Sequence, residues 1–278
     1  MSGPTLRRNV ASKRILSVNG TGPAERTDRV AAEEPMEIRV GGPGQEPGPV
    51  AVTMRTPGGD FELAAGFLFT EGLIRGRDDV ARVAYCELPA EEQNYNVVTV
   101  RLTGPFDSEA VRRNFFSTSS CGICGKASLE EVEVRCAPVA PGPVVAKDVV
   151  SSLPATLREA QRVFDQTGGL HAAGLFDPEG RLVALREDVG RHNAVDKIVG
   201  EALLAGELPL SERILLVSGR ASFEIVQKAA VAGVPIVAAV SAPSSLAVEA
   251  AERFGMTVAG FVRDGRFNLY SHAGRIGG

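Results

Sequence analysis

The stretch LLVSGRASFEIVQKAAVAGVPIVAAVSAPSSLAVEAAE occupies residues 215–252. It contains two runs that are apolar at every position and end at Val217 and Val240, and each run is followed by a segment with the periodicity of a helix. Strands that are apolar throughout and alternate with helices of about ten residues are typical of a parallel sheet covered by helices on both faces. We therefore predict an α/β fold built on this stretch.

The same alternation continues on either side of this stretch. Apolar runs and helical periodicity predict, in chain order, a helix at 192–205, a strand at 214–217, a helix at 222–232, a strand at 236–240, a helix at 245–254 and a strand at 257–262. Before them, the runs 170–176 and 181–186 flank an Asp-Pro-Glu-Gly turn and predict a hairpin. A capping box of Thr156 and Glu159 predicts one more helix, which ends at Gly168.

The first half of the chain has a different pattern. Short runs rich in Val and Ile, separated by turn-forming residues, predict the strands of an antiparallel sheet at 35–40, 50–55, 80–88 and 94–102. Between them, Asp60 is the predicted N-cap of a helix that ends near Gly72 and packs its apolar face on this sheet. We predict four parts: a flexible N-terminus at 1–25, a small N-terminal α+β domain at 26–119, a junction at 120–147 and a C-terminal α/β domain at 148–278.

Composition limits the kind of partner. The 278 residues are 44% apolar and 23% charged, which is a globular composition and excludes collagen, coiled coil and full disorder. The net charge of −4 argues against general binding to nucleic acid, and no apolar run approaches the roughly 18 residues of a membrane helix. The N-terminus has no apolar core of a signal peptide. We therefore expect a cytoplasmic protein with neither nucleic acid nor membrane as its partner.

The predicted junction contains a Cys-x-x-Cys pair, Cys121 and Cys124, among glycines and serines. Such a segment is typical of an exposed loop, and Lys126 would raise the thiolate fraction of a nearby cysteine. Four interpretations are open: half of a zinc site, a thioredoxin-like dithiol, a nucleophilic cysteine that carries a group, or two ordinary loop cysteines. The other two cysteines, Cys86 and Cys136, lie in apolar-periodic segments and are predicted to be core residues.

Two of these interpretations lack sequence support. A zinc site needs about four ligands, and no second close pair of cysteines is present. The zinc deaminases need a His-x-Glu motif, whereas the three histidines are followed two residues later by Ala, Ala and Gly. A thioredoxin dithiol begins a helix directly after a strand, whereas this pair lies between two predicted domains. We therefore predict no metal site.

Candidate binding residues follow the predicted parallel strands. Two turns, 218–222 and 241–245, each lead from a buried strand into a helix through small hydroxyl residues, which favours an anion such as a diphosphate. A third turn adds two arginines suited to phosphate or a planar base, and an Asp that can accept the hydrogens of guanine. The alternatives are ordinary N-caps at Ser222 and Ser244 and an ordinary surface turn. The candidates are Ser218, Gly219, Arg220, Ser222, Ser241, Phe261, Val262, Arg263, Asp264, Gly265 and Arg266.

A third charged segment, Arg186–Lys197, lies at the start of a predicted helix. His192 and Asp196 are spaced i, i+4 and are predicted to touch, which would orient the imidazole ring. A lone histidine at a helix start is more often a cap than a catalyst. We therefore predict that Arg191 and His192 line a ligand site.

With these residues assembled, the sequence resembles the FdhD family, the formate dehydrogenase accessory sulfurtransferases. The matching stretches lie in the family's order along the chain: TPGGDFELAAGFLFTEGLI (56–74), SSCGICGKASLE (119–130), REDVGRHNAVDKIVG (186–200), the stretch 215–252 quoted above and GFVRDGRFNLYS (260–271). Several long motifs in sequence are far more specific than one Cys-x-x-Cys pair.

The resemblance implies a function. Members accept sulfur from a cysteine desulfurase as a persulfide and pass it to the molybdenum (or tungsten) bis(molybdopterin guanine dinucleotide) cofactor before this enters formate dehydrogenase. The family's persulfide cysteine falls on Cys121, its second loop cysteine on Cys124, and its cofactor-binding stretch on Phe261–Arg266. The resemblance also implies a C-terminal domain with the cytidine-deaminase fold but no zinc, a homodimer, apo formate dehydrogenase as a partner, and guanosine diphosphate (GDP) as a mimic of the cofactor.

Two alternatives of other classes remain open at this point. One is a cytosolic dithiol oxidoreductase that forms a disulfide between Cys121 and Cys124. The other is an assembly chaperone without catalytic activity, which only binds the cofactor or the apo-enzyme. A sulfurtransferase, in contrast, needs a thiolate to attack the donor's sulfur, a segment that reaches donor and acceptor, and an acceptor site shielded from free thiols.

Overall fold

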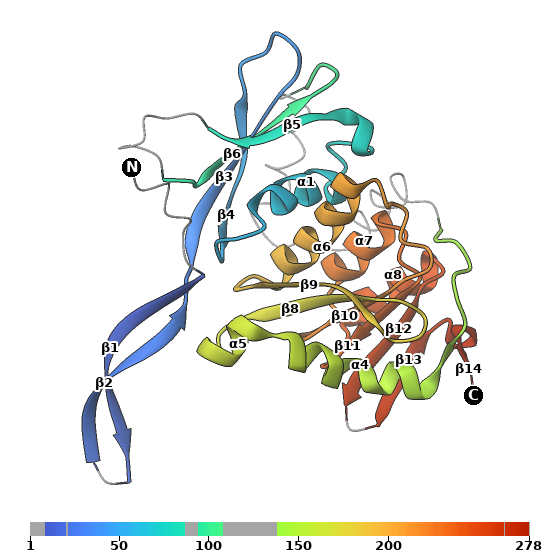
Figure 1. Ribbon diagram of the computed structural model, residues 1–278. Helices are drawn as coiled ribbons and strands as arrows, with labels where there is room; N and C mark the ends of the chain where they lie inside the picture. The colour runs from blue at the N-terminus through green and yellow to red at the C-terminus, as the bar shows by residue number, and fades with distance from the viewer. Residues whose placement is uncertain (1–8, 21, 87–93, 108–137, 264, 278) are drawn as a thin grey trace.

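The computed structural model describes residues 9–20, 22–86, 94–107, 138–263 and 265–277. These residues form a mixed α/β structure of two sheets, with a hairpin that projects from the body (Figure 1). We refer to β3–β6 with α1 as the N-terminal unit and to residues 138–277 as the C-terminal unit.

The larger sheet confirms the parallel strands predicted from residues 215–252. Its centre is formed by β10 (Ile214–Val217), β11 (Ile236–Ala239) and β12 (Thr257–Arg263), which pair in parallel. The helices between them are α7 (Phe223–Val231) and α8 (Ser245–Arg253). All residues of β10 and β11 are buried, as expected of strands covered on both faces.

Antiparallel strands extend this sheet on both sides, so the six-stranded sheet is mixed. The predicted hairpin is present as β8 (His171–Phe176) and β9 (Leu182–Asp188), and β13 (Arg266–Ser271) pairs with β12 at the opposite end. The strand order is β13-β12-β11-β10-β8-β9. A short parallel pair, β7 (Val145–Ala146) and β14 (Ile276–Gly277), lies outside this sheet, next to the 3-10 turn η2 (Ala273–Arg275).

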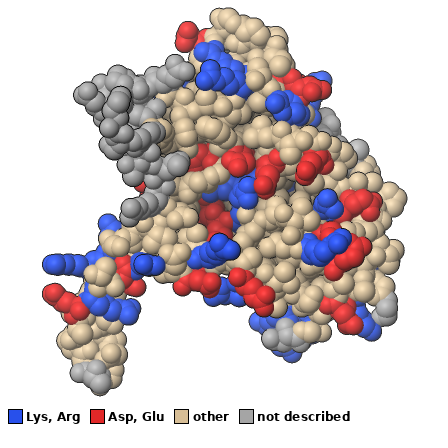
Figure 2. Space-filling view, in the orientation of Figure 1, with Lys and Arg blue, Asp and Glu red and all other residues tan. Residues whose placement is uncertain are grey.

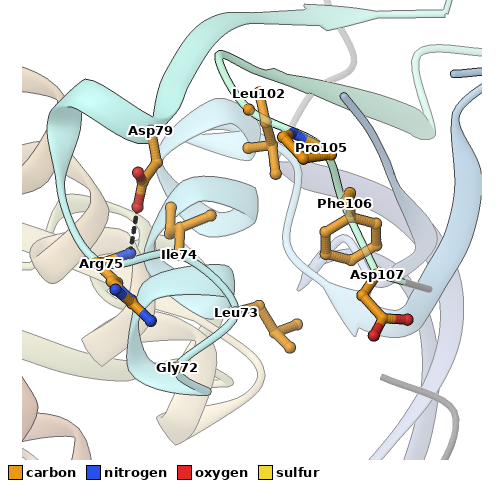
Figure 3. Close-up of a pocket in the computed structure, with 10 residues that line it drawn as sticks. Gly72, Leu73, Ile74, Arg75, Asp79, Leu102, Pro105, Phe106 and Asp107 are labelled. Atoms are coloured by element: carbon orange, nitrogen blue, oxygen red, sulfur yellow. Dashed lines mark hydrogen bonds between the residues drawn. The ribbon is translucent and has the colours of Figure 1, made fainter. Parts of the chain in front are cut away.

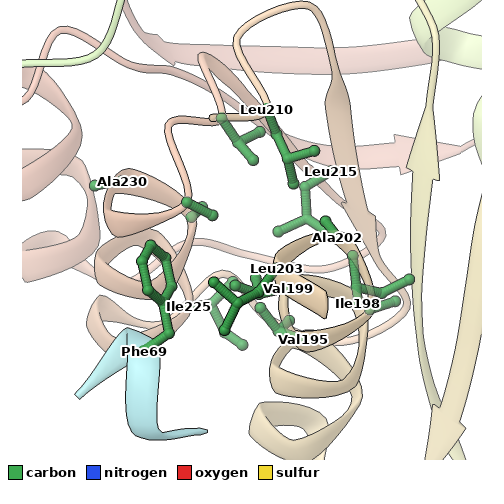
Figure 4. Packing of buried hydrophobic residues seen from close by; sticks show 14 of the residues in the cluster. Phe69, Val195, Ile198, Val199, Ala202, Leu203, Leu210, Leu215, Ile225 and Ala230 are labelled. Carbon is green, nitrogen blue, oxygen red and sulfur yellow. The ribbon is translucent and has the colours of Figure 1, made fainter. Parts of the chain in front are cut away.

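Helices cover both faces of the sheet, as predicted. On one face, α4 (Lys147–Ala160) packs through Leu153 and Leu157 against Ile214 and Leu216 of β10. The alternate residues of β10 point the other way, toward α6 (Arg191–Ala205), α7 and α8, and Leu215 lies in this second cluster (Figure 4). Alternation along the strand therefore separates two layers of core.

The smaller sheet has the strand order β4-β3-β6-β5. Its strands are β3 (Glu34–Gly41), β4 (Gly48–Arg55), β5 (Val80–Tyr85) and β6 (Val97–Leu102), with α1 (Asp60–Thr70) and the 3-10 turn η1 (Arg77–Asp79) between β4 and β5. The antiparallel prediction was wrong for the central pair, because β3 and β6 run parallel. The chain passes through α1 between two hairpins, so that the second hairpin docks beside β3 in the parallel sense (Figure 1).

Backbone contact between α1 and α6 joins the two units. A Cβ atom at Gly66 would lie 1.8 Å from the carbonyl oxygen of Asp196, and one at Gly200 would lie 1.8 Å from that of Glu62. Only glycine permits this approach. Phe69 of α1 then reaches the side chains between α6 and α7 (Figure 4), and one continuous core spans both units.

Two predicted helix starts were wrong. The N-cap of α1 is Gly59, whereas Asp60 is the first helical residue and its carboxylate pairs with Arg55 at 2.8 Å. Helix α4 begins at Lys147, so Thr156 lies in its interior and caps nothing. The apolar spacing of Val150, Leu153 and Leu157 begins earlier than the capping pattern indicated. The predicted end is confirmed, because α5 (Arg162–Thr167) ends at Gly168 in the left-handed conformation.

The N-terminus that was predicted to be flexible contains strand structure at residues 10–19 and 22–25. Strands β1 (Val10–Asn19) and β2 (Gly22–Ala31) pair along their whole length, and the boundary placed at residue 25 falls inside β2. Most of their side chains are exposed, so apolar periodicity gave no sign of the hairpin. The signal was Asn19-Gly20, a dipeptide that favours tight hairpin turns. Basic and acidic side chains are interspersed on this hairpin and over the visible face of the body (Figure 2).

Candidate functional site

One edge of the six-stranded sheet collects the predicted binding segments. At this edge β9, β10, β11 and β12 end and β8 begins, so that Asp188, His171, Ser218, Val240 and Arg263 follow one another across it. We call it the strand-end edge. Five strands at their ordinary spacing span roughly 20 Å, which is long enough for an extended nucleotide.

The two turns after β10 and β11 lie side by side, as predicted. The amide of Ser241 donates to the carbonyl of Gly219 at 3.3 Å, and the amide of Ser244 donates to that of Ala221 at 3.0 Å. A bridge between Ala221 and Pro243 continues this pairing. Each turn then enters a helix, so the N-terminal ends of α7 and α8 meet at the strand-end edge.

The third turn joins them through Phe261. Its amide donates to the carbonyl of Ser241 at 3.1 Å, and its φ of 54° lies in the left-handed region that a phenylalanine rarely adopts. Arg263 lies over the Phe261 ring, and Arg263 and Arg266 are exposed partners across the turn. Val262 is fully buried in the core on the α4 side, so its side chain is not available to a ligand. Asp264 lies outside the described residues.

The two serines at the helix starts differ in what they bond. Ser244 is an ordinary N-cap, because its side chain accepts from the amide of Ala247 at 3.3 Å. Ser222 occupies the N-cap position of α7, but within the described chain its side chain makes no capping bond. Its Oγ lies 3.3 Å from Nε2 of His192 instead. The two helix starts therefore differ, and Ser222 faces the start of α6.

His192 lies between charges of both signs. Its Nε2 is 3.9 Å from a carboxylate oxygen of Glu224, and burial, followed by the charge of Arg191, lowers the pKa of His192. Although burial raises the pKa of Glu224, hydrogen bonds from its own backbone and from Ser222, with the charges of His192 and Arg191, lower it overall. The start of α6 therefore presents a neutral imidazole beside a carboxylate and a guanidinium.

The predicted contact between His192 and Asp196 is wrong. The Asp196 carboxylate is buried and accepts from the Thr70 hydroxyl at 2.7 Å, and Nζ of Lys228 lies 2.9 Å from it. This bond points Asp196 into the interface between α1 and α7. Helical spacing allowed the contact, but a buried partner on another helix competes for the carboxylate.

Arg191 has one polar atom that is unpaired within the described part of the chain. Its Nε is buried and has no hydrogen-bond partner among the residues that the structure describes. A buried unpaired N–H is costly, so its presence favours an acceptor beyond the described residues. His171 lies near both Arg191 and Gly219. Burial lowers the pKa of His171 most, and the charge of Arg191 lowers it further. A Cβ atom added at Gly219 would lie 3.5 Å from Nδ1 of His171. Arg191, His171 and Gly219 therefore lie close together.

A cavity of about 660 Å³ opens at this edge, between the sheet and the break from α4 to α5. Its walls are largely apolar with a few polar groups, which is typical of pockets for planar ligands. They include Leu157, Arg158, Gln161, Phe164, His171 and Ser218. Sequence reasoning found only Ser218 among these. The helix break at Gln161 was the missed signal, because a helix that stops and restarts leaves a concave wall.

The structure describes one of the four cysteines, Cys86. Cys121 and Cys124 lie outside the described residues, as does Cys136. Cys86 was predicted to be a core residue, but it is partly exposed at the end of β5 and lines a cavity of about 370 Å³ with Arg39, Arg82 and Arg101. Among the described residues, no three His, Cys, Asp or Glu side chains gather as metal ligands. The prediction of no metal site stays a prediction.

A further cavity, of about 380 Å³, lies in the N-terminal unit (Figure 3). Leu73, Ile74 and Leu102 form its apolar part, and Asp79, whose carboxylate accepts from the amide of Arg75 at 2.5 Å, lies at its rim. None of the predicted site residues lines it. No helix in the described part of the chain is long and apolar enough to cross a membrane.

The fold and the strand-end edge define a mixed α/β protein in which cationic and hydroxyl side chains gather at the carboxyl ends of parallel strands, as in proteins that bind phosphorylated ligands there. The model of the FdhD/NarQ family matches residues 31–277. The chain therefore belongs to the FdhD/NarQ family, which confirms the resemblance found from the motifs.

Individual relatives agree with this assignment. The chain is 52% identical to the sulfur carrier protein FdhD of Mycolicibacterium paratuberculosis, with 96% of this chain and 99% of that protein covered. It is 50% identical to the protein of the same name from Streptomyces avermitilis, at 98% and 97% coverage. A crystal structure of a proposed formate dehydrogenase accessory protein from Desulfotalea psychrophila superimposes with a TM-score of 0.75 at 26% identity, covering 97% of this chain and all of that one.

Proposed function

We propose that this protein is a sulfur carrier for the maturation of formate dehydrogenase. It takes sulfur from a cysteine desulfurase as a persulfide on Cys121 and delivers it to the bis(molybdopterin guanine dinucleotide) form of the molybdenum cofactor, which is its substrate. Relatives named sulfur carrier protein FdhD, about half identical to this chain over nearly its full length, support the carrier role. We also propose that it works in the cytoplasm as a homodimer.

The observation that carries the acceptor half is the strand-end edge. Arg191 leaves a buried Nε without a partner in the described chain, so this N–H is available to a phosphate oxygen, and the Ser222 hydroxyl contacts His192 and Glu224 rather than capping α7. Arg263 and Arg266 add exposed guanidiniums at the third turn. The cavity beside Ser218 has the apolar walls that a guanine or pterin ring needs. These residues fit a guanine dinucleotide better than a protein disulfide.

The carrier half is a thiol exchange. The Cys121 thiolate attacks the outer sulfur of the donor's persulfide, the donor's cysteine thiolate leaves, and the sulfane sulfur stays on Cys121. Cys124 is three positions further along the chain in the same Ser/Gly-rich segment, and we assign it an assisting or resolving role. A persulfide is lost to free thiols by exchange, so a shielded acceptor site close to the carrier would preserve it.

Mass measurement of the intact protein tests the carrier half. After incubation with a cysteine desulfurase and cysteine, we expect a gain of about 32 Da, one sulfur atom, that Cys121→Ala abolishes because a thiolate is needed to accept it. Cys86→Ala is the matched control, because Cys86 lies on the N-terminal sheet, and it should keep the gain. A gain that persists in Cys121→Ala would contradict the carrier assignment.

The same variant separates the alternatives. A dithiol oxidoreductase would turn over protein disulfides and need no guanine nucleotide, and a chaperone that only binds would still support formate dehydrogenase maturation with Cys121→Ser. GDP contains the guanine and the diphosphate of the proposed substrate, and it is therefore the probe for the strand-end edge in the experiments below.

A further inference from the structure

Asp188 occupies the point at which β9 ends, and its side chain is fully buried. One carboxylate oxygen accepts from the amide of Gly190 at 2.8 Å and from Nδ2 of Asn193 at 3.0 Å. The other accepts from the amide of Thr56 at 3.1 Å and lies 2.7 Å from Nζ of Lys197. A single carboxylate therefore bonds to the first turn of α6 and to the loop that leads into α1.

Lys197 and Thr56 complete this arrangement. Nζ of Lys197 also donates to the carbonyl of Thr56 at 2.9 Å, and the Thr56 hydroxyl accepts from the amide of Val189 at 3.2 Å. Lys197 is 1% exposed, so removal of its partner would leave a charge uncompensated in the core. With four donors the buried carboxylate is well satisfied, and such fully bonded networks hold their members in one geometry.

The first turn of α6 is where this bonding acts on the strand-end edge. Arg191 and His192 directly follow Gly190, the N-cap of α6. Gly190 has no side chain with which to cap the helix. Asn193 is tied to the N-terminal unit as well, because its Nδ2 donates to the carbonyl of Met54 at 2.7 Å. The direction of the Arg191 and His192 side chains therefore depends on bonds made by Asp188 and Asn193.

We propose that Asp188 is a positioning residue for the anion site: it fixes the first turn of α6, and with it Arg191 and His192, against the Thr56–Gly59 loop. Asp188 faces the protein interior and touches no ligand itself. The inference rests on the proposed function only in naming a guanine nucleotide as the ligand.

A second buried ion pair supplies a matched control. Asp60 is 4% exposed and accepts from Arg55 at 2.8 and 3.1 Å, from the Tyr85 hydroxyl at 3.1 Å and from the amide of Gly58 at 3.2 Å. These partners all belong to the N-terminal unit or its loop, and none belongs to α6. Asp60→Asn and Asp188→Asn thus remove comparable buried carboxylates, but of the two only Asp188 bonds directly to α6.

The experiment compares GDP binding by calorimetry in the wild type, Asp188→Asn and Asp60→Asn, at a temperature where circular dichroism shows each folded. We expect both variants to melt at lower temperature than the wild type. Only Asp188→Asn should bind GDP more weakly, by roughly tenfold or more, whereas Asp60→Asn should stay within about twofold. Equal GDP affinities in the two variants would overturn the inference and leave the proposed function standing.

A second readout does not need the ligand. After burial, the charges with the largest effect on the pKa of His192 are those of Arg191, Glu224, Lys228 and Glu71. A change in the His192 pKa, measured by NMR titration, therefore reports that the first turn of α6 has moved. We expect it in Asp188→Asn but not in Asp60→Asn. If the wild type binds no GDP, the acceptor half of the proposed function fails, and an unchanged His192 pKa would overturn the positioning role separately.

If Asp188→Asn does not fold, Asn193→Ala replaces it. This variant removes one of the four bonds to Asp188 together with the bond to Met54, and Asn193 is only partly buried. We expect a smaller loss of GDP affinity, roughly threefold, with a shifted His192 pKa. Wild-type values for both measurements would contradict the positioning role.

Discussion

Ser222 and Ser244 hold the same position at the starts of neighbouring helices, but only Ser244 caps its helix. We expect Ser244→Ala to lower the free energy of unfolding by about 1 kcal/mol, the usual cost of a lost cap. Ser222→Ala should cost less, but it should reduce the rise in melting temperature expected with GDP, because the hydroxyl contacts His192 of the proposed anion site. Urea denaturation and a thermal shift measurement test the pair.

The outcome at these serines separates a cap from a ligand contact. If Ser244→Ala reduces the GDP shift as much as Ser222→Ala does, the anion site is centred on α8 rather than between α6 and α7. Ser222 then becomes an ordinary surface hydroxyl.

His192 gives the stability of the protein a pH dependence of known sign. Burial and the Arg191 charge lower the pKa of His192 in the folded state, so between that value and about 6.5 the unfolded chain binds more protons. The stabilising contribution is fully present above about pH 6.5 and is lost as the pH falls through this window. We expect His192→Asn to lose less unfolding free energy than the wild type between about pH 7 and pH 5, measured by urea denaturation. Equal losses would contradict a neutral His192.

Single residues also show how far the sequence could predict the site. The serine and arginine turns were predictable, because a strand that is apolar throughout must end where polar residues begin. His171, Gln161 and Phe164 were not, because they reach the edge from other strands and helices, and chain spacing carries no information on that pairing. For the same reason the contact of His192 with Asp196 was predicted and that with Ser222 was not.

At the scale of the element, the crossing of α1 and α6 depends on Gly66 and Gly200. An added methyl group at either position would meet a backbone carbonyl, which cannot rotate away as a side chain can. We expect Gly66→Ala or Gly200→Ala to cost about 3 kcal/mol or more, although alanine by itself favours a helix over glycine by about 1 kcal/mol. Urea denaturation measures the cost.

Gly76→Ala is the control for this element. Its added Cβ would have no atom within 4 Å, and its φ of −177° is extended backbone that any residue adopts. We expect a change below about 0.5 kcal/mol. If Gly66→Ala is as mild as Gly76→Ala, the two helices are not in backbone contact.

The positions of the strands in the sequence were predicted more reliably than their pairing within the sheets. Period and apolar runs identified the strands of both sheets except β13, and the parallel centre followed from strands apolar at every position. The parallel pairing of β3 with β6 did not follow, because periodicity defines a strand but not the neighbour beside which it docks. A glycine inside each of two helical patterns was the readable sign of a close crossing, since glycine weakens a helix and needs a packing reason there.

At the scale of the whole molecule, buried charges and a shared core join the two units. Two ion pairs connect α6 with α1. The pair of Asp188 and Lys197 links α6 to the loop before α1. The pair of Asp196 and Lys228 links α6 to the C-terminal end of α1. The core on the α6 side of the large sheet continues under the small sheet without interruption. The two domains predicted from sequence therefore share this core, although their sheets are distinct.

The crossing of α1 and α6 at Gly66 and Gly200 limits how far the two sheets can move relative to each other. Helices whose backbones touch cannot rock or slide by an ångström without collision, so the two sheets form a rigid frame with a constant separation. The groups at the strand-end edge therefore keep a fixed position relative to the small sheet, and the proposed acceptor would have to bind to a site that is already in place.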